Sequence, residues 1–221
     1  MLNRYREVDK CREDIQQFVI LVKKEMKDIP ESDLVCILKG MAFIKKVYAF
    51  PERNNEHYYN CLITDMLGII HAFSKSSLRV YYTFFRSIIE NLVRVILKYE
   101  NTNATGVRNM FAELRDKYNQ NSKEFIDYIE GEYGKCCEVI HSNQRADLTM
   151  YKYYEEIINE DELDIRKIRS LFKQLVRFYD FCKQFMIKEN CEQVSEAFHN
   201  QKEVLKYLLG QRNYDEYLMN T

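Results

Sequence analysis

The sequence predicts an all-α protein, a helical bundle that forms a single domain over residues 1–221. In several long segments the apolar side chains recur at steps of three and four residues, which is the spacing of one face of an α-helix. The chain holds only 6 glycines and 2 prolines, whereas an all-β protein of this size needs many tight turns built from these residues. Hydrophobic residues make up 46% of the chain and charged residues 30%, so the chain can bury a core of its own.

Four helices are expected in the N-terminal half, over residues 3–28, 33–50, 56–73 and 77–99. Pro30 ends the first, and a strand at 34–38 is the alternative within the second. The helix at 77–99 has the clearest pattern, because Ser77 offers a cap and seven apolar residues follow one face. These residues are Leu78, Tyr82, Phe85, Ile89, Leu92, Ile96 and Tyr99, and the opposite face carries Arg79, Arg86, Glu90, Arg94 and Lys98.

Five further helices are expected, over residues 107–118, 123–141, 151–159, 161–188 and 191–209. Thr105 is the expected cap of the first of these, and Gly210 is the expected end of the last. The apolar stripe of 161–188 has heptad-like steps that suit either a dimer interface or the core. We expect core for most of its length, because a bundle of this size needs it. Residues 211–221 either fray or dock on the body.

Charge and cysteine content narrow the class of protein. Lys and Arg total 33, and Asp and Glu total 34, so no overall field draws the chain to nucleic acid or membrane, although a local basic groove remains open. The 7 cysteines show no C-x-x-C or zinc-finger spacing and are expected to be reduced, buried thiols. A cytoplasmic protein without membrane contact is expected, since there is no apolar leader and no uncharged run near the roughly 18 residues of a membrane span.

Common catalytic motifs are absent from the sequence. There is no Gly-rich phosphate loop, no G-x-S-x-G and no H-E-x-x-H, which argues against nucleotide kinases, α/β hydrolases and zinc proteases. No cofactor and no metal site is predicted.

Two groups of polar residues are candidates for chemistry. Arg86, Glu90 and Arg94 lie at i, i+4 and i+8 on one helix face, where they form either an intrahelical ion-pair ladder or a charged face that lines a cleft. His141 ends a helix and opens a polar loop. Its imidazole is either a structural cap of the negative helix end or a general acid or base, because an unperturbed histidine titrates near about pH 6.5.

Two segments, YYTFFRSIIENLVRVIL at 81–97 and YGKCCEVIHSN at 133–143, resemble the HEPN superfamily of small helical proteins in bacterial toxin–antitoxin, abortive-infection and CRISPR-linked defence. The resemblance covers roughly residues 74–143. It implies an up-and-down helical core over about 56–189, with additional N-terminal helices and a C-terminal helical extension over about 190–221. It also implies a metal-independent endoribonuclease of phage defence or of a toxin–antitoxin system, acting on RNA as a homodimer.

The resemblance also assigns roles to individual residues. His141 is the catalytic histidine, and Glu90 is the acidic residue of the earlier helix. Arg86 and Lys135 would stabilise the charge that develops on the phosphate during cleavage. The remaining residues of the predicted site would bind RNA: Arg94, Asn143 and Arg145.

The sequence departs from the family at one position of the motif. Lys135 and Cys136 stand where catalytic members carry an arginine, five or six residues before the histidine. Lysine keeps the positive charge but lacks the two-pronged grip of a guanidinium on phosphate. Arg86 or Arg145 is the alternative source of that grip.

The alternative function is a non-catalytic helical-bundle protein, HEPN-like or unrelated, that binds RNA or a protein partner such as an antitoxin. Geometry separates the two functions. A ribonuclease of this kind needs His141, Glu90 and at least one arginine together in an open cleft.

Overall fold

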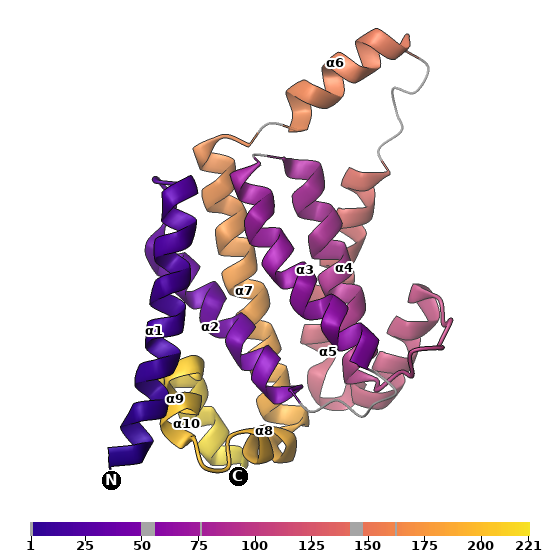
Figure 1. The fold of residues 1–221 in the computed structure, drawn as a ribbon. Coiled ribbons are helices and arrows are strands. Elements are labelled where there is room, and N and C mark those ends of the chain that lie inside the picture. The colour runs from indigo at the N-terminus through magenta and orange to yellow at the C-terminus, as the bar shows by residue number, and fades with distance from the viewer. Residues whose placement is uncertain (1, 50–55, 76, 142–147, 162) are drawn as a thin grey trace.

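The structure is a computed structural model that describes residues 2–49, 56–75, 77–141, 148–161 and 163–221 (Figure 1). These ranges contain α-helices and no β-strand, so the predicted all-α class is confirmed. The helices are α1 (Leu2–Glu25), α2 (Glu31–Val47), α3 (Glu56–Ser74), α4 (Leu78–Ile96), α5 (Val107–Ile140), α6 (Met150–Asp161), α7 (Ile165–Glu189), α8 (Cys191–Ala197), α9 (Lys202–Leu209) and α10 (Gln211–Asn220).

The centre of the molecule is an up-and-down bundle of α3, α4, the second half of α5 and α7, in which successive helices run in opposite directions (Figure 1). Hydrogen bonds between distant parts of the chain fix the register of these helices. Arg79 in the first turn of α4 donates to the carbonyl of Ile140 in the last turn of α5. Ser122 of α5 donates to Glu189 at the end of α7. α2 packs across α7, and α9 packs against α1, α2 and α10.

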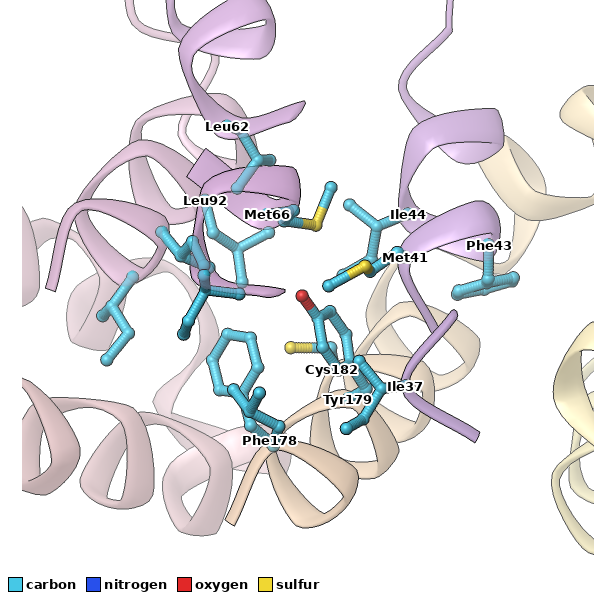
Figure 2. Close-up of a cluster of buried hydrophobic side chains, with 14 of the residues drawn as sticks. Ile37, Met41, Phe43, Ile44, Leu62, Met66, Leu92, Phe178, Tyr179 and Cys182 are labelled. Atoms are coloured by element: carbon cyan, nitrogen blue, oxygen red, sulfur yellow. The ribbon is translucent and has the colours of Figure 1, made fainter. Parts of the chain in front are cut away.

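The shared core lies where α2, α3, α4 and α7 meet (Figure 2). Residues that are far apart in the sequence interdigitate there, and all of them are buried: Ile37, Met41, Ile44, Leu62, Met66, Leu92, Phe178, Tyr179 and Cys182. The last three belong to α7, so the heptad-like stripe of that helix faces the interior. The expectation of core for this stripe is confirmed.

α4 begins as its sequence predicts and is buried on more sides than expected. The Ser77 side chain accepts the backbone N–H of Val80 at 3.2 Å and caps the helix. Phe85, Ile89, Leu92, Ile96 and Tyr99 of the predicted stripe are buried. The opposite side is covered as well, because α3 packs on one flank of α4 and α5 on the other.

Several element boundaries differ from the predicted ones. The strand alternative at 34–38 is wrong, since these residues lie inside α2. The predicted break near 119–122 is a kink within α5, at Ser122 with φ −129° and ψ 23°. Thr105 is not the cap of α5, because Gly106 holds that position without a side-chain hydrogen bond. Residues 191–209 form two helices, and the segment after Gly210 docks as α10 with Tyr217 buried.

α6 extends beyond the end of the bundle and contacts α4 there (Figure 1). One side of it is apolar and exposed, and its members are Met150, Tyr151, Tyr154 and Ile158. No helix in the described part of the chain combines the length and the apolar character that crossing a membrane requires.

Candidate nucleic-acid interface

The contact between α4 and α5 decides which predicted residues meet. Arg79 reaches the carbonyl of Ile140 at 2.9 Å, and the Nε of Arg86 donates to the hydroxyl of Tyr133 at 3.1 Å. The two helices are therefore antiparallel, and His141 lies at the Arg79 end of α4. Glu90 lies eleven residues further along α4, which is about 16 Å at 1.5 Å per residue. The expected meeting of His141 and Glu90 in one cleft is absent.

Arg86 and Glu90 have separate partners. The pKa of Arg86 is raised chiefly because its guanidinium donates to the Tyr133 hydroxyl, and its Cζ lies 5.4 Å from the centre of the Tyr133 ring. Glu90 pairs instead with Arg94, at 3.0 Å. The ion-pair ladder is thus present over one of its two predicted steps, and Arg86 ties α4 to α5.

Arg94, which is predicted to bind RNA, is buried, with 9% of its surface exposed. Its Nη2 donates to Glu90 and to the carbonyl of Thr105 at 3.2 Å, and its Cζ lies 5.1 Å from the centre of the Tyr58 ring. In this structure Arg94 therefore offers little free surface for the predicted RNA contact. The side chain joins α4 to α3 and to the turn before α5.

Lys135 belongs to a polar network between α4, α5 and α7. It is exposed and donates to the buried carboxylate of Glu132 at 2.7 Å. Gln174 of α7 donates to the same carboxylate and accepts a hydrogen bond from Tyr81 at 3.0 Å. The network supplies partners for a buried charge. Lys135 keeps its ammonium at the surface while it neutralises Glu132.

His141 is exposed at the C-cap of α5, where its backbone N–H donates to the carbonyl of Cys137 at 2.9 Å. Among the described residues, Arg79 lies at this helix end, and its positive charge suits the negative end of a helix dipole. Arg86 lies about two turns away along α4. Asn143 and Arg145, the other predicted contacts of this end, lie outside the described residues.

A basic stripe on α7 is a feature that lies outside the site predicted from the sequence. Its members follow one another at steps of three and four residues on the face opposite the core, and all are exposed: Arg166, Arg169, Lys173 and Arg177. Among the described residues, none of the four forms an ion pair with a carboxylate. A row of uncompensated cations along a helix is the electrostatic footprint of a polyanion-binding surface.

The basic stripe lies beside α5. The guanidinium of Arg177 sits 5.0 Å from the ring centre of Tyr128 and 5.4 Å from that of Phe181, and these two rings stack across the α5–α7 boundary at 4.4 Å. Glu132 and Gln174 are bonded across the same boundary. His141 lies nine residues after Glu132 on α5, and Ile165 lies nine residues before Gln174 on α7. Because the two helices are antiparallel, both residues lie at the same end of the bundle. The stripe therefore runs from the Tyr128 level to the His141 end of the bundle.

Two glycines leave the neighbouring surface of α5 without side chains. Gly131 and Gly134 are exposed inside the helix, and an added Cβ would meet nothing within 4 Å at either position. Glycine in a helix interior costs about 0.5–1 kcal/mol relative to alanine, and no packing contact in the bundle calls for it here. Lys135 follows directly, so this part of α5 offers bare backbone next to a cation.

The sequence does contain a signal for the basic stripe. Residues 165–179 hold five cations and no carboxylate, but the net charge of −1 for the whole chain conceals this local excess. The apolar periodicity of the same segment identifies its buried side and leaves the cations on the other.

Comparison with known proteins finds no matching family model, no matching curated protein and no matching solved structure. Among the residues that the structure describes, no three His, Cys, Asp or Glu side chains gather as they would around a metal ion.

Proposed function

We propose that this chain is a non-catalytic, HEPN-like helical-bundle protein that binds RNA along the basic stripe of α7. The observation that carries the proposal is the row of four exposed cations without carboxylate partners among the described residues, on one helix face. Such a row neutralises successive phosphates and releases their counterions, which is the main sequence-independent source of affinity for nucleic acid. RNA rather than DNA follows from the resemblance of residues 81–97 and 133–143 to the HEPN superfamily.

The separation of His141 from Glu90 supports binding without cleavage. A general acid or base must lie within hydrogen-bond reach of the reacting groups, and its partners must meet it there. Glu90 is about 16 Å away along α4 and is held by Arg94. Lys135 stands where catalytic members of the family carry an arginine. Here it pairs with Glu132, so its charge serves the bundle itself.

A second candidate function, RNA cleavage at His141, is favoured by one contact. Arg79 bonds the carbonyl of Ile140, so a guanidinium stands next to the residue that precedes His141. It is a different arginine from the ones predicted for this role. In this function His141 would move the proton and Arg79 would stabilise charge on the phosphate.

Fluorescence anisotropy with a labelled single-stranded RNA tests the proposal. We expect Arg169→Gln together with Lys173→Gln to weaken binding by about tenfold or more at moderate salt. The matched control is Lys24→Gln together with Lys27→Gln, which also removes two exposed cations and is expected to leave binding unchanged. Equal losses in both double variants would show that net charge alone governs the affinity.

A cleavage assay on the same RNA separates the two candidate functions. Under the proposal the RNA stays intact with the wild-type chain and with His141→Ala. RNA fragments that appear with the wild type and vanish with both His141→Ala and Arg79→Ala would establish the ribonuclease instead.

The proposal includes a cytoplasmic setting in phage defence or a toxin–antitoxin system, with a homodimer or a protein partner such as an antitoxin. The exposed apolar side of α6 supports a partner, because Met150 is 90% and Tyr151 is 72% exposed and an exposed apolar helix face commonly marks a protein contact. Sedimentation velocity of the wild type and of Tyr151→Asp together with Tyr154→Asp tests the homodimer. A dimer that persists in this variant would place its interface elsewhere.

A further inference from the structure

A second cationic site lies where α1, α2, α9 and the start of α10 come together, at the other end of the molecule from the C-terminal end of α5 (Figure 1). A pocket of about 400 Å³ opens there, and Arg12, Lys39, Glu203, Lys206, Tyr207 and Gly210 line it. This volume lies within the usual range of small-ligand sites. The pocket is separate from the basic stripe on the N-terminal half of α7.

Two of the cations are held against one aromatic ring. The Nζ of Lys39 lies 4.0 Å from the ring centre of Tyr207, and the Cζ of Arg12 lies 5.2 Å from the same point. Tyr207 and Lys39 are both half-buried. The ring attracts each cation and thereby fixes two positive groups, from α1 and α2, at the same opening.

Charge in the pocket is poorly balanced. Of the described residues that line it, three are cations and one, Glu203, is a carboxylate. Arg12 forms an exposed ion pair with Asp9 at 3.4 Å. An exposed pair of this kind holds the guanidinium only weakly. Within the described part of the chain, no carboxylate lies at ion-pair distance from Lys39 or Lys206. Like charges this close repel one another, and a bound anion would remove that repulsion.

The start of α10 adds backbone donors at the rim. Gly210 has φ +78°, a left-handed conformation that glycine adopts without strain, and it turns the chain from α9 directly into α10. Among the described residues no side chain caps α10, and the N–H groups in the first turn of a helix have no intrahelical acceptor. These groups and the positive end of the helix dipole favour an anion at the same opening.

We propose that this pocket binds a phosphate or pyrophosphate group. Arg12 offers the forked donors that match phosphate oxygens, Lys39 and Lys206 supply point charges, and the first turn of α10 supplies N–H donors. The group belongs either to a free small anion or to the 5′ end of an RNA. The site does not depend on the proposed RNA contact along α7.

Isothermal titration of the full chain with inorganic pyrophosphate tests the site. We expect one site per chain, and an affinity that falls about tenfold in each of Arg12→Gln, Lys39→Gln and Lys206→Gln. Lys24→Gln removes an exposed cation of α1 outside the pocket and is the matched control, which should bind as the wild type does. Circular dichroism and thermal unfolding confirm that each variant is folded.

Three outcomes would overturn the proposal. The first is a folded wild-type chain that does not bind pyrophosphate at all. The second is a control variant that loses as much affinity as the pocket variants. The third is weaker pyrophosphate binding in Lys173→Gln on the basic stripe, with no loss in the pocket variants, which would place the anion on α7.

A second experiment identifies the source of the phosphate group. It compares the binding of two RNAs of one sequence, one with a 5′-triphosphate and one with a 5′-hydroxyl. A preference for the triphosphate that Lys39→Gln abolishes assigns the pocket to the RNA end. Equal binding of the two RNAs, with pyrophosphate binding still dependent on Lys39, assigns the pocket to a free anion. Both results support the phosphate site, and the binding of the 5′-hydroxyl RNA reports separately on the α7 stripe.

Discussion

Gly40 of α2 lies directly against Tyr179 of α7: a Cβ added to Gly40 would stand 2.5 Å from the Tyr179 Cβ and 2.6 Å from its Cγ. Both residues are buried. The atoms in conflict are the root of the Tyr179 side chain, which cannot swing aside as a flexible tip can. The close crossing of α2 over α7 therefore requires glycine at this position.

Replacing Gly40 and Gly131 by alanine should change the free energy of unfolding in opposite directions. Gly40→Ala is expected to lower the free energy of unfolding by about 1–3 kcal/mol, because the added methyl overpacks the core. Gly131→Ala is expected to raise it by about 0.5–1 kcal/mol, since its Cβ meets nothing and alanine favours the helix. Urea unfolding of the two variants checks this pair. A Gly40→Ala chain as stable as the wild type would contradict the close crossing.

The end of α4 is stabilised by a backbone motif that carries an unfavourable residue. Tyr99 N–H bonds the carbonyl of Arg94 and Lys98 N–H bonds that of Val95, while Lys98 has φ +56°. A side chain in this left-handed conformation costs about 1–2 kcal/mol. Lys98→Gly should therefore stabilise the chain by about 1 kcal/mol in thermal unfolding. Lys98→Ala is the control for loss of charge, and it should show no such gain.

Asp65 links α3 to α4. Its Oδ2 accepts hydrogen bonds from Ser87 at 2.6 Å and from Asn91 at 3.0 Å. Asp65→Ala is expected to cost about 1–3 kcal/mol of unfolding free energy, because two half-buried donors lose their charged acceptor. Asp65→Asn keeps one acceptor oxygen and should cost less. Chemical denaturation measures both, and equal stability of Asp65→Ala and the wild type would show that this link does not stabilise the α3–α4 contact.

Cys136 should make stability depend on pH in the alkaline range. Burial, and then the nearby Glu132 charge, raise the pKa of its thiol to about 12, whereas an unfolded thiol ionises near about 8.5. The pKa of the thiol is higher in the folded chain than in the unfolded chain. Its contribution to the free energy of unfolding is therefore fully present below about pH 8.5 and is lost as the pH rises toward 12. We expect a loss of about 1 kcal/mol between about pH 8 and 9.5. Cys136→Ala should lose less over that range, and Cys36→Ala, at an exposed site, should lose as much as the wild type.

The affinity of RNA for the basic stripe should fall as the salt concentration rises, by an amount set by the number of phosphates that the stripe neutralises. For a single strand, the slope of log affinity against log salt is about −0.7 for each phosphate neutralised. Arg169→Gln should therefore make the slope shallower by about 0.7, and the double change with Lys173→Gln by about 1.4. Anisotropy titrations over a series of salt concentrations give the slopes. Identical slopes for wild type and double variant would show that the stripe does not touch the phosphates.

The buried side of each long helix was predictable, because apolar periodicity reports burial directly. The stripe of α4 and the core side of α7 are examples. Arg94 shows the limit of this reasoning. Its position opposite the apolar stripe indicates an exposed face, and only the arrival of Tyr58 and Thr105 from neighbouring segments buries it.

The candidate site was predictable to a smaller extent. His141 was expected at a helix end, and it is the C-cap of α5. Which arginine joins that end depends on the relative register of two antiparallel helices, and helical spacing within one helix carries no information on it. The cations of α7 are visible in the sequence, but the sequence does not show that all four are exposed and lie beside α5.

The contact of Arg12 with Tyr207 has a consequence for the order of events during synthesis. The two residues are 195 positions apart in the chain, and a ribosome needs about 10–40 s to add that many residues. Throughout that interval the early half of α1 lacks the surface of α9 on which it finally rests. α1 therefore gains its packing against α9 only after α9 has been translated, so its contacts in the folded chain are completed late relative to its synthesis.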